Sequence, residues 1–284
     1  MTSLLTAANV DGARTDAGTA QPVRLRGVDR SFPRARGSHD VLRGIELDVG
    51  AGEIVAIVGP SGCGKSTLLR LVGGLDSATG GSIQIDGSRV ADVDERTAVA
   101  FQEPRLLPWR TIAQNVEIGL PRGTSRRDGR ARVRELLALV GLEHAADQHP
   151  SEVSGGMAQR ASLARALARN PGVLLLDEPF GALDALTRLR MHDLLLKIHA
   201  AEPTTVLLVT HDVEEALYLA DRVLLLRTLA DDTDAGAPSI ARTVAVPGIR
   251  PRDRADGGLA DLRAELLEGL GVDTHHRTAP EETR

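Results

Sequence analysis

The chain has one cysteine, two lysines, five aromatic residues and no long hydrophobic run. Its one cysteine, Cys63, excludes an intramolecular disulfide framework and favours a reducing compartment. No apolar stretch reaches the roughly 18 residues that a helix needs to span a bilayer, so we expect no membrane-spanning segment. A net charge of −5 also disfavours nucleic acid as the main partner, because nucleic-acid-binding proteins usually carry a basic surface.

Lysine occurs only at positions 65 and 197, because nearly all basic residues are arginine. Lys65 belongs to the stretch Gly59-Pro60-Ser61-Gly62-Cys63-Gly64-Lys65-Ser66-Thr67, which fits the phosphate-binding pattern G-x-x-x-x-G-K-[ST]. A predicted strand, Glu53 to Val58, precedes this stretch, and a predicted helix begins at Lys65. The order of strand, glycine-rich loop and helix predicts a P-loop. The alternative is a glycine-rich turn that binds nothing.

The P-loop pattern needs these residue types for physical reasons. Glycines allow successive backbone N–H groups to point at phosphate oxygens, and the helix N-terminus adds a partial positive charge. We expect Lys65 to contact the β and γ phosphates and Ser66 to bind magnesium. We interpret Cys63 as a small residue in a tight loop, with redox control as the alternative. The expected phosphate-binding residues are Gly59, Ser61, Gly62, Cys63, Gly64, Lys65, Ser66 and Thr67.

Two adjacent carboxylates follow a second apolar segment. The run from Val173 to Leu176 has no polar residue, as expected for a strand in a sheet covered on both faces, and it leads into Asp177 and Glu178. Carboxylates at the end of a buried strand are costly to desolvate unless a cation or a reacting water is near. We therefore expect Asp177 to face magnesium and Glu178 to polarise water. A purely structural pair is the alternative.

Three further side chains are candidates for ligand contacts. His211 follows the apolar run Thr205 to Val209, at the end of a strand where ligands bind in open α/β sheets, and we expect it to contact the γ-phosphate. Gln102 ends a predicted strand that starts at Val99, and its side-chain oxygen could reach magnesium or the attacking water. Phe32 lies on a predicted polar loop and could stack on a base, with core packing as an equal alternative.

A second anion site is predicted at Ser154, Gly155 and Gly156. Ser154 is the natural N-cap of a helix, so its hydroxyl, free backbone N–H groups and the helix dipole converge on one spot. Two consecutive glycines weaken the start of a helix and indicate the close approach of another group. The alternative is an ordinary cap that binds no ligand.

The interval from about Glu103 to Ala158 is helical in pattern and is predicted to be inserted between two strands. Its start places Leu106, Leu107 and Trp109 among two prolines, which stop regular structure. Exposed apolar residues on such a segment commonly mark a docking surface. A small satellite core is the alternative.

The chain resembles the ATP-binding subunit of ABC transporters over about residues 23–227. Any one motif is weak evidence, but six motifs in the family's order are specific. They are Walker A at Gly59–Thr67, the Q-loop at Gln102, the signature at Val153–Met157, Walker B at Val173–Glu178, the D-loop at Gly181–Asp184 and the H-loop at His211. The resemblance implies an α/β P-loop NTPase of the ABC ATPase type. It would have a mixed β-sheet core, an antiparallel β subdomain and an inserted α-helical subdomain.

The resemblance also implies how the motifs work together. Two identical chains would pair head to tail, with each ATP between the P-loop of one chain and residues 154–156 of the other. Glu178 would be the catalytic base, and His211 would hold the γ-phosphate. Phe32 would stack on adenine, and Asp184 would communicate across the interface between the chains.

Magnesium is the second expected cofactor beside ATP, held by Ser66, Gln102 and Asp177 in the family's arrangement. Gln102 would also serve the reacting water, and so we count it with the catalytic residues. The signature departs from the usual Leu-Ser-Gly-Gly-Gln, because it has Val153 and Met157 at its ends. Met157 cannot donate a hydrogen bond as glutamine could.

We expect three parts along the chain. Residues 1–21 are predicted to be a disordered tail, because they are rich in Ala, Gly, Thr and Asp. Residues 22–228 would form the ATPase domain, with the helical subdomain at about 103–158. Residues 229–284 would form an extension with a short strand at Thr243–Val246 and a short helix at Leu259–Leu270, followed by a disordered end.

A narrower resemblance rests on Phe101 to Trp109, on the signature, on Asp184 to Arg188 and on the short tail. These are similar to the nitrate, sulfonate and taurine importer branch, and most to its aliphatic sulfonate ATPases. The resemblance implies a peripheral protein at the cytoplasmic face of the cell membrane. Its partners would be a permease resting near Leu106, Leu107 and Trp109 and, indirectly, an extracytoplasmic solute-binding protein.

Other functions remain as alternatives. The ATPase never touches the cargo, so a different cargo or an exporter is possible within the family. A soluble ABC ATPase acting on nucleic acid or ribosomes usually needs tandem cassettes, coiled-coil insertions or basic stripes, and this chain has none of them. A GTP-driven switch would need an Asn-Lys-x-Asp guanine-binding motif, which neither lysine provides.

Overall fold

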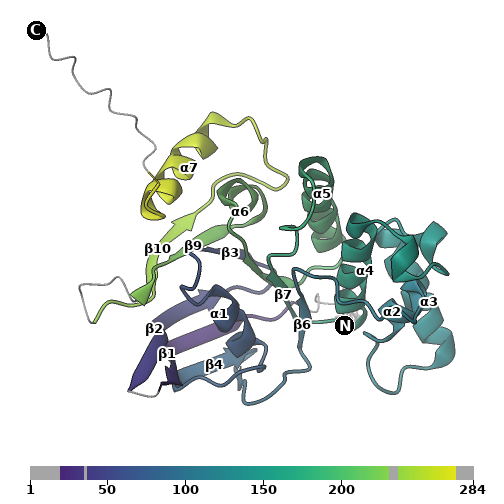
Figure 1. Cartoon of the computed structure of the whole chain (residues 1–284), viewed down its shortest axis with the longest axis horizontal. Coiled ribbons are helices and arrows are strands. Elements are labelled where there is room, and N and C mark those ends of the chain that lie inside the picture. The colour runs from purple at the N-terminus through teal and green to yellow at the C-terminus, as the bar shows by residue number, and fades with distance from the viewer. Residues whose placement is uncertain (1–19, 35–36, 230–235, 273–284) are drawn as a thin grey trace, which may run out of the picture.

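The computed structural model describes residues 20–34, 37–229 and 236–272. Two β-sheets and several helices make up this part of the chain (Figure 1). Helices α2 (Ile112–Glu117) and α4 (Gly155–Ala168) lie at the right of that view, and α7 (Gly257–Gly269) lies at the top.

One sheet is antiparallel and has four strands in the order β2-β1-β4-β5. In β1, Val23 and Leu25 are buried whereas Arg24 and Arg26 are exposed, so the sheet has one apolar face. This is the antiparallel arrangement that the alternating pattern before the P-loop predicts. The strands are β1 (Val23–Pro33), β2 (Ser38–Val49), β4 (Gly80–Ile85) and β5 (Ser88–Arg89).

The other sheet has six strands in the order β10-β9-β3-β8-β7-β6. All neighbouring pairs are parallel except β10 and β9. The strand expected at Val99 to Gln102 lies two residues earlier, because its pairing with β7 runs from Thr97 to Ala100. The strands are β3 (Ile54–Val58), β6 (Thr97–Ala100), β7 (Val173–Asp177), β8 (Thr205–Val209), β9 (Arg222–Leu226) and β10 (Ile240–Ala245).

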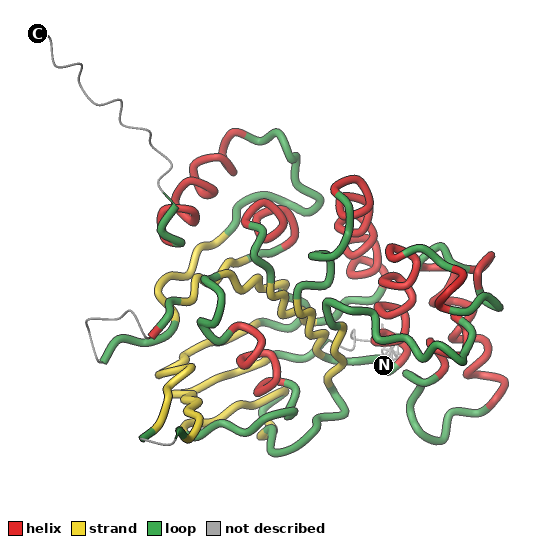
Figure 2. Tube along the Cα trace, in the orientation of Figure 1, coloured by secondary structure: helices red, strands yellow, loops and turns green. Residues whose placement is uncertain are grey.

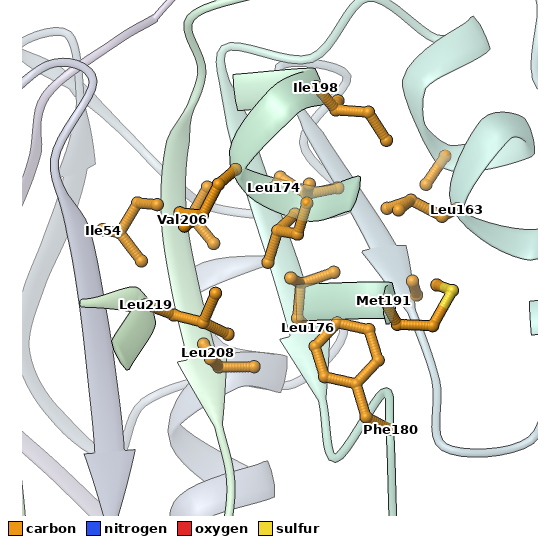
Figure 3. Close-up of a cluster of buried hydrophobic side chains, with 14 of the residues drawn as sticks. Ile54, Leu163, Leu174, Leu176, Phe180, Met191, Ile198, Val206, Leu208 and Leu219 are labelled. Carbon is orange, nitrogen blue, oxygen red and sulfur yellow. The ribbon is translucent and has the colours of Figure 1, made fainter. Parts of the chain in front are cut away.

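The six-stranded sheet is covered on both faces, which explains its almost wholly apolar strands. Successive residues of β3 point to opposite sides, so that Ile54 and Val55 belong to different clusters. Helices α4, α5 (Ala185–Ala201) and α6 (Val213–Leu219) cover one face, and α1 (Lys65–Val72) and the antiparallel sheet cover the other. Figure 3 shows part of the first cluster, formed by Ile54, Leu174, Leu176, Val206 and Leu208 of the sheet with Leu163, Phe180, Met191, Ile198 and Leu219.

The chain between β6 and β7 is helical, as its pattern predicts. It contains α2, α3 (Arg126–Leu139) and α4, with short 3₁₀ helices at Glu143–Ala145 and Pro150–Glu152. These helices form a group beside the sheets (Figure 2). The predicted α/β class, with its antiparallel sheet and helical insertion, is confirmed.

The extension after residue 228 contains the strand and the helix expected there, but both begin earlier than the sequence indicates. Its strand, β10, covers Ile240–Ala245 and pairs with β9, and Leu266 of α7 is fully buried in the main core. The extension therefore completes the six-stranded sheet and does not stand apart from it.

The beginning of the described chain also differs from the sequence-based expectation. Gln21, which we placed in the disordered tail, donates from its backbone N–H to the carbonyl of Gly172, and its own carbonyl accepts from the Thr205 hydroxyl. The rest of the predicted tail, 1–19, and the predicted disordered end, 273–284, lie outside the described residues. Within the part that is described, no helix is both long and apolar enough to cross a membrane.

Candidate functional site

Most of the predicted site residues lie where four neighbouring parallel strands end. The strands β3, β8, β7 and β6 lie side by side in the sheet, and their carboxyl ends share one edge. In that order, they lead into the P-loop at 59–67, His211, the pair Asp177 and Glu178, and Gln102.

Close packing explains the glycines of the P-loop. A methyl group at Gly59 would lie 2.7 Å from both Sγ of Cys63 and the Leu226 carbonyl oxygen. Gly64 has a φ of 100°, which favours glycine, and a methyl group there would lie 2.7 Å from Cδ2 of Leu42. The loop thus packs tightly against the end of β9 and against β2.

The side chain of Lys65 folds over its own loop. Its ammonium group donates hydrogen bonds to the carbonyl oxygens of Gly59 at 2.8 Å and Pro60 at 2.9 Å. Lys65 is only 8% exposed, and no carboxylate among the described residues forms an ion pair with it. A buried ammonium group held only by carbonyls is positioned to receive an anion.

Cys63 is 1% exposed and belongs to the core between the sheets. Burial raises the pKa of its thiol, although the neighbouring Lys65 acts in the opposite direction. A protonated, buried thiol is a poor nucleophile. These properties favour the interpretation of Cys63 as a small packing residue over redox control.

Ser66 and Asp177 are joined directly. The Ser66 hydroxyl donates a 2.8 Å hydrogen bond to Oδ1 of Asp177. Both groups supply oxygen, which magnesium prefers, and such sites usually take one or two protein ligands beside substrate phosphates. In the described ranges, no three His, Cys, Asp or Glu residues form a cluster that could hold a metal ion by itself. The pair fits a magnesium ion that is shared with a phosphate.

Glu178 has a backbone conformation that is rare for its residue type. Its φ is 47°, and such strain costs on the order of 1–3 kcal/mol and often occurs at functional sites. Its N–H donates to the Val209 carbonyl, which links the ends of β7 and β8. Its Oε2 lies 3.4 Å from Nδ1 of His211. His211 is the more exposed of the two side chains, so both groups can reach a ligand at this edge.

Gln102 and His211 approach each other around Gly181. A methyl group at Gly181 would lie 3.3 Å from Nε2 of Gln102 and 3.7 Å from Cε1 of His211. Gln102 is exposed and lies two residues beyond the end of β6, on a loop and not in the strand where the sequence placed it. A loop position leaves its side chain free to move toward a ligand.

Ser154 caps α4, as predicted. Its hydroxyl oxygen accepts a 3.3 Å hydrogen bond from the backbone N–H of Met157. A methyl group at Gly156 would lie 2.7 Å from Cγ2 of Thr187, so the close neighbour expected there belongs to the same chain. A methyl group at Gly155 would meet nothing within 4 Å. Gly155 therefore has no packing role within this chain.

Asp184 and Phe32 belong to elements other than the four strands that share this edge. Asp184 caps α5 and accepts a 3.0 Å hydrogen bond from the Thr187 N–H, and its hydrogen bonds to Thr187 lower the pKa of its carboxyl group. Phe32 lies within β1, not on a loop, and is half-buried. The guanidinium of Arg30 lies 4.2 Å from the centre of its ring. This arrangement leaves base stacking and packing as open roles for Phe32.

The expected docking residues divide into two groups. Leu106 packs against the main core and not in a separate small core, and Leu107 is half-buried. Trp109 is 71% exposed. The buried Asn115 holds the loop, since its amide donates to the carbonyls of Leu107, Arg110 and Thr111.

The sequence-based reasoning missed Gln159. This residue of α4 is buried, and its amide donates a 3.1 Å hydrogen bond to the Phe101 carbonyl, next to Gln102. It thereby ties the helix that begins at Ser154 to the loop that carries Gln102. Its only sequence signal is a polar residue on the apolar side of a helix.

Comparison with known proteins identifies the family. The model of the family described as "ABC transporter" matches residues 42–181. The aliphatic sulfonates import ATP-binding protein SsuB 1 of Mesorhizobium japonicum is 47% identical over 93% of this chain and 91% of its own length. The chain belongs to the ABC transporter family. The protein of the same name from Streptomyces avermitilis is 49% identical over 92% of this chain and 91% of its own length.

Solved structures of ABC ATPases have the same fold as this chain. A dimeric ATP-binding cassette in a post-hydrolysis state, bound to ADP and Pi, aligns with a TM-score of 0.67 and 33% identity. The alignment covers 80% of this chain and all of the other. CbiO1 of Clostridium perfringens, part of an ABC transporter complex, aligns with a TM-score of 0.65 over 72% of this chain and 83% of its own. The predicted family, the ABC ATPase fold and the ATPase activity are confirmed.

Proposed function

We propose that this ABC ATPase drives the import of aliphatic sulfonates through a separate permease. The observation that carries this proposal is the identity of 47–49% to two aliphatic sulfonates import ATP-binding proteins, over more than nine-tenths of each chain. The aligned region therefore includes most of the extension after residue 228 in addition to the motifs.

In this proposal, ATP binds with magnesium at the shared edge of the six-stranded sheet. The P-loop N–H groups and Lys65 hold the phosphates, and Ser66 and Asp177 hold the metal. Glu178 accepts a proton from the water that attacks the γ-phosphate. His211, 3.4 Å from Glu178, and Gln102 orient the same phosphate and water.

Two copies of the chain would complete each site. Ser154 and Gly156 line a depression of about 580 Å³ with Arg160 and Thr187, and no residue of the P-loop lines it. The signature and the P-loop are therefore separate surfaces of one chain, which supports a site shared by two. Leu186 and Leu189, next to Asp184 on α5, are exposed apolar residues that a second chain would cover.

The protein would act at the cytoplasmic face of the membrane. Trp109 is the large exposed apolar side chain of the loop before α2, so it would meet a cytoplasmic helix of the permease. An extracytoplasmic binding protein would deliver the solute to that permease. ATP-driven closure of the two ATPase chains would move the permease, and hydrolysis would reset it.

The shared site can be tested by mixing two inactive variants. Lys65→Ala inactivates the P-loop, and Ser154→Ala inactivates the signature. If each site takes one P-loop and one signature from different chains, a mixed pair contains one intact site, and mixing restores hydrolysis. If each chain holds its whole site, the mixture stays inactive, which contradicts the pairing. A mixture of Lys65→Ala with Lys65→Arg serves as the matched control that must remain inactive.

The cargo can be tested by uptake in cells that lack this chain. We expect a deletion strain to lose uptake of labelled ethanesulfonate, and the wild-type chain to restore it whereas Lys65→Ala does not. Uptake of taurine and nitrate is measured in the same cells. Unchanged ethanesulfonate uptake in the deletion strain, with loss of another solute, would overturn the sulfonate assignment and leave the ATPase assignment intact.

A further inference from the structure

A cavity lies between α5, Tyr218 of α6 and the segment that follows β10. Its volume is about 580 Å³, within the range of pockets for small ligands. Part of its wall is apolar, formed by Leu196, Ala200, Ile249 and Pro251. Its lining includes no residue of the P-loop, of Walker B or of the signature. The cavity therefore lies outside these motifs, although Asp193 and Lys197 also line the depression beside Ser154 and Gly156.

The cavity also has a cation whose hydrogen-bonding capacity is not filled. Nε of Arg250 lies 3.2 Å from Asp221, but its Nη1 is buried and has no hydrogen-bond partner among the described residues. A buried donor of a charged group that lacks an acceptor costs free energy. Lys197 lines the same cavity, and no hydrogen bond or ion pair within the described chain engages its ammonium group.

Positive charge exceeds negative charge around this cavity. The nearby Arg252 is buried and donates to the backbone carbonyls of Val246, Pro247, Leu217 and Tyr218, so no carboxylate is hydrogen-bonded to it. Asp193 lines the cavity, but it already accepts from the Tyr218 hydroxyl at 2.6 Å and from Arg254 at 3.2 Å. Only Asp221 remains to balance Arg250, Arg252 and Lys197.

From these features, we propose that the cavity binds a small organic anion, with its charged group on Arg250 and Lys197 and its apolar body against Leu196 and Ile249. The charged group fits because Nη1 of Arg250 lacks an acceptor. The apolar body fits because Ile249 is 92% exposed at the rim, and a ligand would cover it. A carboxylate and a sulfonate share this chemistry.

The position of the cavity gives such a ligand a route to the ATP site. Helix α5 begins beside Asp184, and α6, which carries Tyr218, begins beside His211. The cavity touches both helices and the segment after β10. A ligand there would hold three elements together, two of which begin at the catalytic edge of the sheet.

Tyr218 makes a direct test possible, because it is the only tyrosine in the chain and it lines the cavity. The full chain is labelled with ¹³C-tyrosine and saturated with Mg-ADP, so that the P-loop is filled. Hexanesulfonate, hexanoate, hexan-1-ol and inorganic sulfate are then titrated separately while the ring resonances of this one tyrosine are followed. We expect a saturable shift with one or both organic anions, at concentrations where hexan-1-ol and sulfate cause none.

Two variants test the contacts. Arg250→Gln and Lys197→Gln should each weaken anion binding about tenfold or more, the effect of losing one hydrogen bond to a charged group. Arg134→Gln, at an exposed position of α3, is the matched control and should change nothing. If Arg250→Gln does not fold, Lys197→Gln decides, because Lys197 is exposed on a helix. The proposal is overturned by no saturable shift, by equal binding of hexan-1-ol or sulfate, or by unchanged affinity in Lys197→Gln.

Discussion

Ser66 and Asp177 lie 111 positions apart in the sequence, yet the hydroxyl of one donates a 2.8 Å hydrogen bond to the carboxylate of the other. This bond joins the first residue after the P-loop lysine to the end of β7, across the intervening strand β8. The two oxygen-bearing groups that would hold magnesium in the proposed site are thus joined by the fold of the chain itself. Such preorganisation lowers the cost of placing a metal ion.

Ser66→Ala should weaken magnesium binding and so raise the magnesium concentration that hydrolysis needs. The substitution removes one oxygen ligand, and even an outer-sphere partner of a metal ligand is worth about 10- to 100-fold in affinity or activity. We expect the half-saturating magnesium concentration to rise by a similar factor in steady-state ATPase assays. Ser66→Thr keeps the hydroxyl and is the control. Equal magnesium dependence in both variants would remove Ser66 from the metal site.

Glu178→Gln should abolish turnover and preserve ATP binding. The amide keeps the size of the side chain but cannot accept a proton, and loss of a general base typically costs about 10²–10⁴-fold in rate. Single-turnover hydrolysis measures the rate, and fluorescent-nucleotide titration measures the affinity. Normal hydrolysis by this variant would mean that another group is the base.

Gly155→Ala and Gly156→Ala should differ in their effect on the stability of the isolated chain. Gly155 has free space around it, so Gly155→Ala should leave the thermal stability of the isolated chain unchanged or slightly raised, because alanine favours a helix by about 1 kcal/mol. It should nevertheless lower the rate of hydrolysis by on the order of 100-fold. The added methyl group would displace the phosphate of the ATP bound to the P-loop of the second chain by about 1 Å. Full activity of Gly155→Ala would contradict a phosphate contact there.

Gly156→Ala should instead destabilise the chain, because its methyl group would lie 2.7 Å from Cγ2 of Thr187. Overpacking of this kind typically costs about 1–3 kcal/mol. Removal of the opposing methyl group in Gly156→Ala/Thr187→Ser should recover most of the lost unfolding free energy in urea denaturation. Such a recovery would show that the loss of stability in Gly156→Ala comes from packing against Thr187 and not from a lost ligand contact.

His192 and Glu215 should show strong energetic coupling. They form a 2.9 Å pair between α5 and α6, each side chain is 3% exposed, and His192 also contacts Phe180 edge to face. His192→Leu would leave a buried carboxylate without its partner, at a cost of about 3–5 kcal/mol. The double variant His192→Leu/Glu215→Leu should lose much less than the sum of the two single variants. Additive losses in urea denaturation would show that the pair does not act as a unit.

Cys63 should resist alkylation in the folded chain. Burial raises the pKa of its thiol above the ordinary value of 9.0, so the thiolate fraction at pH 8 falls below that of a free cysteine. We expect slow modification by iodoacetamide in native buffer and rapid modification in guanidinium chloride, followed by mass spectrometry. Rapid native modification with loss of ATPase activity would favour the redox alternative.

Local patterns allowed much of the site to be predicted. The P-loop needs particular residue types within nine positions between a strand and a helix, so Lys65 and Ser66 were identified from sequence alone. The apolar strand before Asp177 and Glu178 is similarly local. The placement of Gln102 was less accurate, because the end of β6 depends on its pairing with β7 and not on the composition of β6.

Contacts between distant segments could not be predicted. The position of Thr187 against Gly156 depends on how α5 packs beside α4, and the bond from Gln159 to Phe101 depends on how α4 lies across the Q-loop segment. Leu106 shows the same limit, because its packing against the core depends on residues far away in the sequence. Only Trp109 kept the exposure expected of a docking residue.

The pairing of β10 with β9 has a consequence for how the molecule behaves among its neighbours. β9 reads Arg-Val-Leu-Leu-Leu, and β10 occupies the hydrogen-bonding edge that this apolar strand would otherwise offer to other molecules. A form shortened at residue 228 would leave that edge bare, and bare apolar edges recruit strands from other copies into aggregates. We therefore expect the extension to lower self-association of the ATPase in a crowded cell.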